Sequence, residues 1–260
     1  MPTAESIIPG WVPFKSKMEA AGDFILFNIR FLKQSVKRPF EGRELLVQCY
    51  RMGNNSLPLV LITAFIMGLV LTLQTRPSLV AFGAENLLPG MVSVSVIKEI
   101  GPVITAIICA GKISSRIGAE LGSMRVTEQI DAMEVSAINP FKYLVVTRVL
   151  AATCMLPLLV IFADTISIFS SWMAFNIHGE MSLTAYFNAA LSKLDWIDII
   201  PSMIKSVLFG TAIGIVGSYK GFCVEGGTAS VGRAANSAVV TASLAIFFID
   251  MITVQITDIL

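Results

Sequence analysis

Five ionisable side chains fall inside stretches of the sequence that are otherwise almost wholly apolar. They are Lys98, Glu99, Asp164, Lys205 and Asp250. A charge inside a membrane span is costly, so such residues are candidates for function by default. Two cations and three anions could pair, whereas isolated ions in lipid would shift their pKa values and become neutral. The pattern indicates either a structural ion-pair cluster that fixes helix register or a polar gate beside a transport path.

A second chemical pattern lies in the polar segment 125–137. It combines two helical stripes, an acidic one of Glu128, Asp131 and Glu134 and an apolar one of Val126, Ile130, Met133 and Ala137. We expect Thr127 to cap the start of this helix and Asn139-Pro140 to end it, because a residue before proline avoids the helical region. Two interpretations stay open: a solvated face over a membrane-embedded base, or a docking helix for a cytoplasmic partner.

The composition decides what surrounds these patterns. Of 260 residues, 55% are hydrophobic and only 14% are charged, against about 25% charged in soluble domains. This excludes a cytosolic enzyme, a disordered chain and a secreted disulfide scaffold, and predicts an integral membrane protein. The net charge of +1 gives no basic footprint for nucleic acid. Four scattered cysteines without a CxxC spacing predict neither a disulfide nor a metal site.

Stretches of about twenty apolar residues can cross a bilayer as helices. The sequence predicts five spans: Leu57–Leu73, Met91–Gly111, Val149–Phe175, Ile199–Gly217 and Ser237–Ile256. Phe14–Leu32 mixes charges with phenylalanines and predicts an amphipathic helix in the membrane interface. The expected fold is therefore all-α, with an interfacial segment over residues 1–56 and a five-helix domain over residues 57–257.

The distribution of Lys and Arg predicts the orientation of the chain in the membrane. Residues 1–56 hold eight, the loop after the second span holds five, and the loop after the fourth span holds two. The opposite loops hold only Arg76 and Lys193. We therefore expect a cytoplasmic N-terminus and a periplasmic C-terminus. In this orientation all five intramembrane charges lie in the outer half of the bilayer at comparable depth, which favours one shared site.

Several charge-bearing motifs resemble the MlaE/YrbE permease family. They are Lys98-Glu-Ile-Gly-Pro-Val103, Glu120-Leu-Gly-Ser-Met-Arg-Val-Thr-Glu-Gln-Ile-Asp-Ala-Met-Glu134, Asn139-Pro140, Thr147-Arg-Val-Leu-Ala151, Lys205-Ser-Val207, Gly232-Arg-Ala234 and Asp250. The resemblance covers residues 45 to 257. Members of this family are the membrane subunits of Mce-associated ATP-binding-cassette (ABC) transporters, which move phospholipids or other lipids between the inner and outer membranes.

The resemblance implies a set of partners for the chain. They are an ABC ATPase subunit that binds ATP and Mg, a periplasmic Mce-domain protein, a small STAS-domain protein in many cases, and a second copy of this chain in a homodimer. It also implies that residues 125–137 form the coupling helix, with Arg125, Glu128, Gln129, Asp131, Met133 and Glu134 at the ATPase contact. By the family's geometry, Leu69, Leu71 and Leu73 line a lipid cavity at the dimer centre or simply face lipid.

The function expected from these features is that of a non-catalytic permease subunit for phospholipid or a related lipid in the bacterial inner membrane. No cofactor is expected on this chain, since it has no phosphate-binding loop. At the nearest match, Gly111-Lys112, Ile113 replaces the required hydroxyl residue. Two alternatives stay open: an ion-coupled transporter that uses the intramembrane Asp and Lys residues, and a membrane scaffold that transports nothing.

Overall fold

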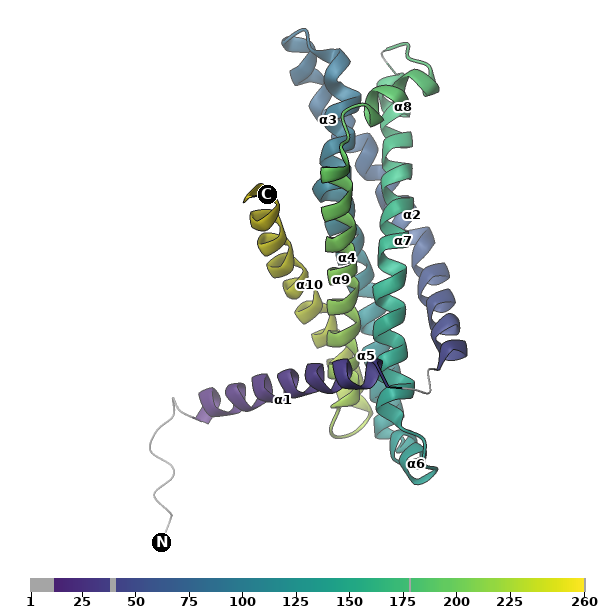
Figure 1. Cartoon of the computed structure of the whole chain (residues 1–260), viewed down its shortest axis with the longest axis vertical. Coiled ribbons are helices and arrows are strands. Elements are labelled where there is room, and N and C mark those ends of the chain that lie inside the picture. Colours follow the sequence, from purple (N-terminus) through teal and green to yellow (C-terminus); the bar gives the residue numbers. More distant parts are fainter. Residues whose placement is uncertain (1–11, 38–40, 178, 260) are drawn as a thin grey trace.

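The long apolar runs of the sequence fold into long helices that lie side by side. A computed structural model describes residues 12–37, 41–177 and 179–259, and every regular element in these ranges is helical. The α-helices are α1 (Val12–Ser35), α2 (Gly42–Ala81), α3 (Leu88–Ser95), α4 (Gly101–Cys109), α5 (Ser115–Val126), α6 (Gln129–Val135), α7 (Thr147–Phe175), α8 (Leu183–Leu191), α9 (Trp196–Phe222) and α10 (Thr228–Ile259). Short η segments join some of them (Figure 1).

Within the described residues, five helical stretches are long and apolar enough to cross a membrane. They are Gly42–Ala81, Glu85–Val126, Phe141–Phe175, Trp196–Phe222 and Thr228–Thr257. The all-α fold with five spans is therefore confirmed, and each stretch contains one of the predicted spans. The first spanning helix, α2, begins at Gly42, so the predicted boundary after residue 56 falls inside α2 and not at its start.

The second and third spans are not uniform α-helices. The second span contains π-helical turns at η2 (Val96–Ile100) and η3 (Ala110–Ser114), and the third span begins with η4 (Phe141–Val146). π-helical turns inside α-helices are rare and occur frequently at functional sites. The second span thus departs from α-helical geometry at the segment that carries Lys98 and Glu99.

The core of the bundle depends on close helix packing. Ala152, Phe209 and Ile213 are fully or almost fully buried in one apolar cluster shared by the spans. Gly210 and Gly214 of α9 lie directly against the backbone of α7, and a Cβ added at Gly210 would lie 2.6 Å from the carbonyl oxygen of Ala152. Small residues allow such close approach of membrane helices.

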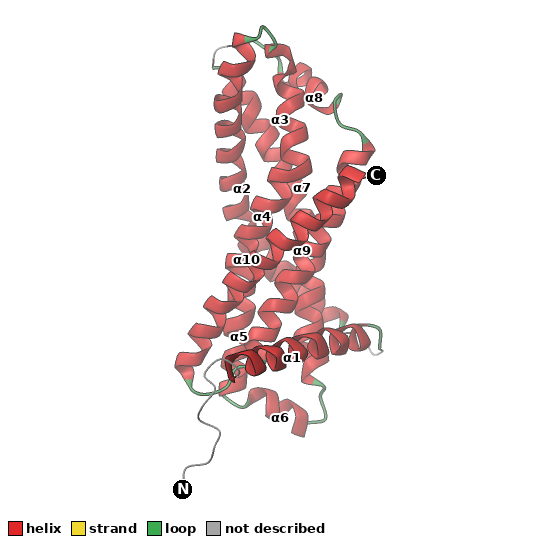
Figure 2. Cartoon of the chain, turned by 90° about the vertical axis from the view of Figure 1, so that its left-hand side faces the viewer, coloured by secondary structure: helices red, strands yellow, loops and turns green. Residues whose placement is uncertain are grey.

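Two elements sit together at one end of the bundle. α1 lies across the bundle axis and α6 lies beside it at that end, while α3 and α8 lie at the other end (Figures 1 and 2). Phe27 and Phe31 of α1 are buried against the bundle, and Phe27 makes an edge-to-face contact with Phe141. Ile25, Ile29 and Leu32 are exposed along one face of the same helix, as suits a helix that faces lipid on one side.

Helix contact at Gly210 gives a direct test of the packing. Gly210→Ala should lower the free energy of unfolding by about 1–3 kcal/mol, because the added methyl group forces α7 and α9 apart. Gly232→Ala is the matched control, since a Cβ added there meets nothing within 4 Å. The control should unfold no more easily than the wild type, because alanine favours a helix over glycine. Chemical unfolding in mixed micelles measures the free energy of unfolding of both variants. Equal changes in the two variants would contradict the close packing of α7 and α9 at Gly210.

Candidate functional site

Lys205 is the centre of an ion-pair cluster between three spans. Its side chain is 5% exposed on α9. Its Nζ donates to the carboxylate of Glu99 on η2 and lies 3.3 Å from Oδ1 of Asp250 on α10. A buried ammonium requires such partners, because an unpaired charge in a low-dielectric site is strongly destabilising. One cation thus joins the second, fourth and fifth spans.

A second ion pair lies next to the first. Nζ of Lys98 lies 2.9 Å from Oδ1 of Asp198, near the start of α9. The other carboxylate oxygen of Asp198 accepts a hydrogen bond from the backbone amide of Asp195, which satisfies one of the free amides at the helix start. Asp198 therefore both caps α9 and binds a cation of the second span.

The spacing of these residues explains why they meet. Asp198 and Lys205 are seven residues apart on α9, which places them on one face two turns from each other. Lys98 and Glu99 are neighbours in sequence, and side chains of successive residues do not normally share a helix face. The π-helical turn at η2 carries both, and both reach partners on the same face of α9.

A small pocket opens between these groups. Its volume is about 50 Å³, and its walls include Lys98, Glu99, Asp198, Lys205 and Thr257. The side chains of Lys98 and Glu99 are 45% and 41% exposed, whereas that of Lys205 is almost fully enclosed. The cluster therefore has a buried cation at its centre and two half-exposed residues at its edge.

The structure brings together four of the five predicted intramembrane charges. Asp164 lies on α7, is 7% exposed, and has no ion pair among the described residues. Its Oδ1 is buried without a hydrogen-bond partner and lies directly against Gly101, where a Cβ would be only 1.8 Å away. Asp164 faces the second span but not Lys205, so its place in the cluster stays a prediction without a contact to support it. Asp198, which we did not predict, is the additional anion.

The segment predicted to be one coupling helix is divided. Arg125 belongs to α5, which ends at Val126, and α6 covers only Gln129–Val135. Glu128 separates them with a left-handed backbone (φ 57°), which turns the chain between the two helices. The expectation of a continuous helix over residues 125–137 was therefore wrong, and the hydroxyl of Thr127 bonds back to the carbonyl of Ser123 and does not cap α6.

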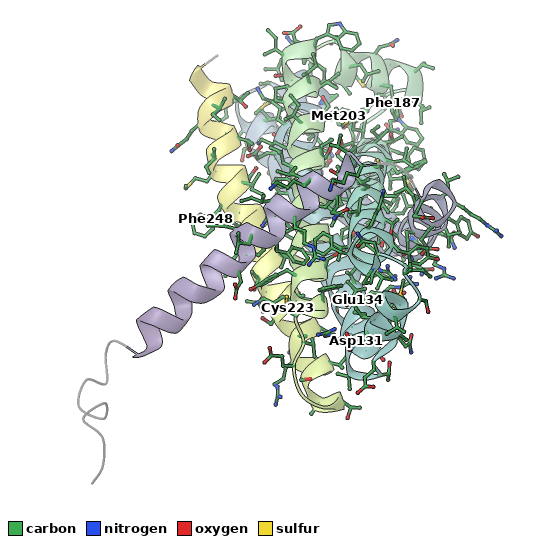
Figure 3. The ribbon with its side chains drawn as sticks, turned by 60° about the horizontal axis from the view of Figure 1, so that its bottom comes forward. Asp131, Glu134, Phe187, Met203, Cys223 and Phe248 are labelled. Atoms are coloured by element: carbon green, nitrogen blue, oxygen red, sulfur yellow. The ribbon has the colours of Figure 1, made fainter. Side chains whose placement is uncertain are left out.

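α6 is attached by one side and open on the other. Ile130 is fully buried and Met133 packs on the edge of the core, so these two residues of the apolar stripe face the bundle. Ala137, the last residue of the stripe, lies beyond α6 and is exposed, with a left-handed backbone (φ 60°). Glu134 is exposed, and Asp131 is exposed while pairing with Nη1 of Arg125 at 2.5 Å (Figure 3). Val135 is 89% exposed, which is unusual for a valine in a short helix. The open face of α6 is thus acidic with an apolar tip.

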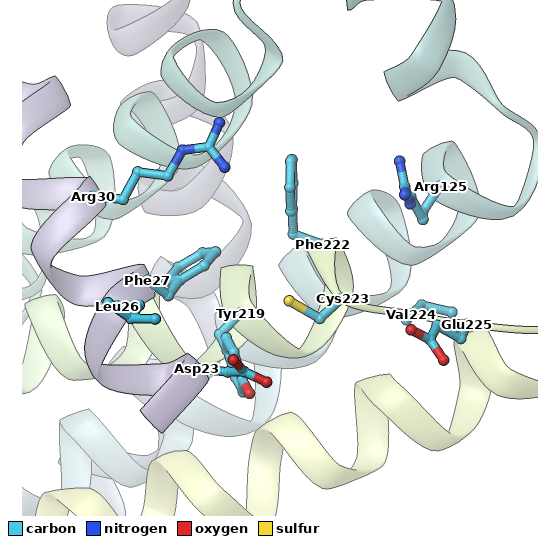
Figure 4. A pocket seen from close by; sticks show the side chains of 10 residues that line it. All are labelled: Asp23, Leu26, Phe27, Arg30, Arg125, Tyr219, Phe222, Cys223, Val224 and Glu225. Atoms are coloured by element: carbon cyan, nitrogen blue, oxygen red, sulfur yellow. The ribbon is translucent and has the colours of Figure 1, made fainter. Parts of the chain in front are cut away.

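A wide groove lies at the same end of the bundle as α6 (Figures 1 and 4). It has a volume of about 580 Å³ and runs between α1, the end of α5 and the end of α9. Opposite charges line it, with Arg30 and Arg125 among the cations and Asp23 and Glu225 among the anions. Arg125 both lines the groove and pairs with Asp131, so the groove and α6 share a residue.

The three leucines of the predicted lipid cavity lie on α2. Leu71 packs against an apolar cluster that includes Leu88 and Ile168. Leu73 is 48% exposed, and Leu69 is half-buried. The cavity was expected between two subunits, so it stays a prediction that a second copy of the chain would complete.

Comparison with known proteins points to one family. Residues 45–256 match the permease MlaE family. A probable ABC transporter permease protein of Rickettsia prowazekii (strain Madrid E) is 36% identical over 228 residues, which cover 88% of each chain. Another, from Synechocystis sp. (strain ATCC 27184 / PCC 6803 / Kazusa), is 37% identical over 211 residues, which cover 79% of this chain and 78% of its own.

A plant protein is similar over nearly the whole chain. The Arabidopsis thaliana protein TRIGALACTOSYLDIACYLGLYCEROL 1, chloroplastic, is 32% identical over 259 residues, which cover 96% of this chain and 72% of the plant protein. The similarity therefore extends beyond bacteria.

The ion pairs predict a specific pattern of energetic coupling. Lys205→Met alone should destabilise the protein by about 3 kcal/mol, the lower end of the range for a buried pair, because the carboxylate of Asp250 is largely buried whereas that of Glu99 is half-exposed. In the double variant with Asp250→Asn the loss should be smaller than the sum of the single losses by about 1–3 kcal/mol. Free energies of unfolding for the four proteins of the cycle provide the measurement.

Asp164→Asn is the matched control for this cycle, since Asp164 is a buried intramembrane aspartate without a bond to Lys205. Its effect should add to that of Lys205→Met. The assignment would be wrong if the stability losses of Lys205→Met and Asp250→Asn simply added while those of Lys205→Met and Asp164→Asn did not. Lys205 would then pair with Asp164.

Proposed function

This chain belongs to the MlaE permease family, as its sequence motifs predicted, and we propose from that premise that it is the membrane subunit of an ABC transporter for lipid. Its substrate in this proposal is phospholipid or a related lipid, moved between the inner membrane and the outer envelope. Its relatives carry the name of ABC transporter permease, which supports a membrane subunit driven by a separate ATPase.

A lipid substrate has two sources of support. One relative, the Arabidopsis protein, is named after a glycolipid, trigalactosyldiacylglycerol. The chain also exposes a series of large apolar side chains on α10, among them Val240, Leu244, Phe247 and Met251. Such a surface suits contact with acyl chains or with a second subunit.

The open face of α6 is the observation on which the proposed ATPase contact depends. Buried Ile130 holds α6 to the bundle, so a force on α6 would pass through α5 to the rest of the second span. Asp131, Glu134 and the exposed Val135 remain available for a partner. A charged rim around an apolar tip is typical of protein interfaces. A partner on α6 would also reach the groove at Arg125.

The assembly and its orientation complete the proposal. We place the α1 and α6 end of the bundle in the cytoplasm of a bacterial inner membrane, because most Lys and Arg residues outside the spans lie in the segments of this end. The family resemblance supports a homodimer with an ATPase on this side, together with a STAS-domain protein, and an Mce-domain protein on the opposite side. The ion-pair cluster, near the α3 and α8 end, then lies in the outer half of the membrane.

Ion-coupled transport is the second candidate, and Asp164 is the observation that favours it. The buried carboxylate oxygen of Asp164 has no hydrogen-bond partner, and such a group can bind and release a proton that crosses the membrane. The two candidates differ in their energy source. Lipid movement by the reconstituted chain that follows a proton gradient without any ATPase would favour this second function.

Charge reversal on α6 tests the proposed ATPase contact. Glu134→Lys should reduce ATP-driven lipid transport and association with the ATPase about tenfold or more, because a lysine replaces an anion at a desolvated contact. Glu134 has no ion-pair partner among the described residues, so the fold of the permease should not change. Co-purification with the ATPase and transport in proteoliposomes are the two measurements.

Glu180→Lys is the matched control, since it makes the same charge change on an exposed residue near α8, at the opposite end of the bundle. It should leave association with the ATPase unchanged. If the Glu134→Lys protein associates with the ATPase and transports lipid as well as the wild type does, the assignment of α6 to the ATPase contact is wrong.

A further inference from the structure

A pocket between α2 and the second span contains more positive charge than the protein neutralises. It lies among Arg51, Asn55, Ser56, Lys112, Arg116 and Glu120 and has a volume of about 50 Å³. The one anion of this set, Glu120, pairs with Arg148 at 2.8 Å. Lys112 donates to the backbone carbonyl of Asn55, which carries no charge. Three cations therefore face one pocket without an anion to offset them.

Two of the three cations are free to bind a ligand. Arg51 and Arg116 are exposed and form no ion pair among the described residues. The nearby carboxylate of Glu44 accepts hydrogen bonds from Gln48, which also lines the pocket, and from the hydroxyl of Tyr143. An arginine fork binds a phosphate or carboxylate through parallel hydrogen bonds, so two unpaired arginines favour an anionic ligand.

A buried hydroxyl points to the same ligand. Ser56 is 1% exposed and lines the pocket, yet its Oγ has no hydrogen-bond partner. A buried polar group without a partner costs free energy, and native proteins rarely leave one unsatisfied. An oxygen of a ligand in the pocket would accept the hydrogen of Ser56. The pocket has room for a group the size of a few water molecules, which suits a phosphate and not a whole lipid.

The position of the pocket identifies the source of the phosphate. Arg51 comes shortly before Leu57, where the apolar run of α2 begins, so its side chain lies where hydrocarbon gives way to headgroups. α1 lies across the bundle at the same end and exposes Ile25 and Leu26, as a helix in the headgroup region would. Lipid phosphates occupy this depth in every bilayer. Basic pockets between membrane helices at this level bind the headgroups of anionic lipids.

We propose that Arg51, Lys112, Arg116 and Ser56 form a binding site for the phosphate headgroup of an anionic phospholipid, in the leaflet at the α1 and α6 end. The site is far along the second span from Lys98 and Glu99, and it is separate from the ion-pair cluster around Lys205. Headgroup binding here requires neither ATP nor a partner, so it stands independently of the proposed transport.

Lipid retention by the purified full-length chain tests the site. Native mass spectrometry would compare bound phosphatidylglycerol with phosphatidylcholine of the same acyl chains. The wild type should retain phosphatidylglycerol preferentially, and Arg51→Gln with Arg116→Gln should reduce that preference by about fivefold for each cation removed. The control is Arg43→Gln with Arg233→Gln, which removes two exposed cations that do not line the pocket. An equal loss in both double variants would overturn the proposal.

Ser56→Ala separates a ligand site from a defect in packing. In phosphatidylcholine the variant should be at least as stable as the wild type, because it removes a buried hydroxyl without a partner. In phosphatidylglycerol it should gain less stability from the lipid than the wild type does. If Ser56→Ala gains as much stability from phosphatidylglycerol as the wild type does, Ser56 does not bind the lipid and the proposed site is wrong. Inorganic phosphate should not reproduce the stabilisation, and if it does, the ligand is a soluble anion and the lipid assignment is wrong.

Discussion

A lysine buried within a membrane bundle needs anions close by, and the arrangement of the spans around Lys205 follows from this requirement. The ammonium group contacts Glu99 on the second span and Asp250 on the fifth. If either helix were rotated, a carboxylate and a cation would be left apart in a low-dielectric environment, which is strongly unfavourable. The ion pairs therefore favour one relative rotation of the three helices. Apolar packing alone discriminates poorly between rotations, because lipid tails are as apolar as the side chains.

The two ends of the bundle have different chemistry, and the second span connects them. Near one end it carries Lys98 and Glu99, and near the other it continues through α5 toward α6. π-helical turns at η2 and η3 lie along the way, and such turns occur frequently at functional sites. A transporter with ATP hydrolysis at one end and a polar gate toward the other needs such a mechanical link. In our proposal the second span is that link.

The sequence predicted the features that depend on length and composition, such as the number of spans. It failed to predict contacts that depend on the direction in which a side chain points. Apolar runs located all five spans, and depth along each helix grouped Lys98, Glu99, Lys205 and Asp250, whose ion pairs all involve residues of α9. Depth says nothing about rotation, so it also included Asp164, which faces Gly101. Asp198 was missed because the fourth span was predicted to start after it, although its spacing of seven from Lys205 was a usable signal. The break at Glu128 required a left-handed residue that no sequence pattern indicates for glutamate.

The sequence leaves open whether the Lys205 cluster only fixes helix register or also acts as a polar gate, and we expect it to do both. The most direct test neutralises Lys205 and its two partners with Glu99→Gln, Lys205→Met and Asp250→Asn, which leaves no unpaired charge because Lys98 and Asp198 still pair with each other. Lipid transport and ATP hydrolysis are then measured together in proteoliposomes that contain the assembled transporter. A gate predicts a stable complex that hydrolyses ATP but moves lipid no faster than liposomes without the ATPase. Normal lipid transport by this variant would contradict the gate and show that the cluster only fixes the register of the helices.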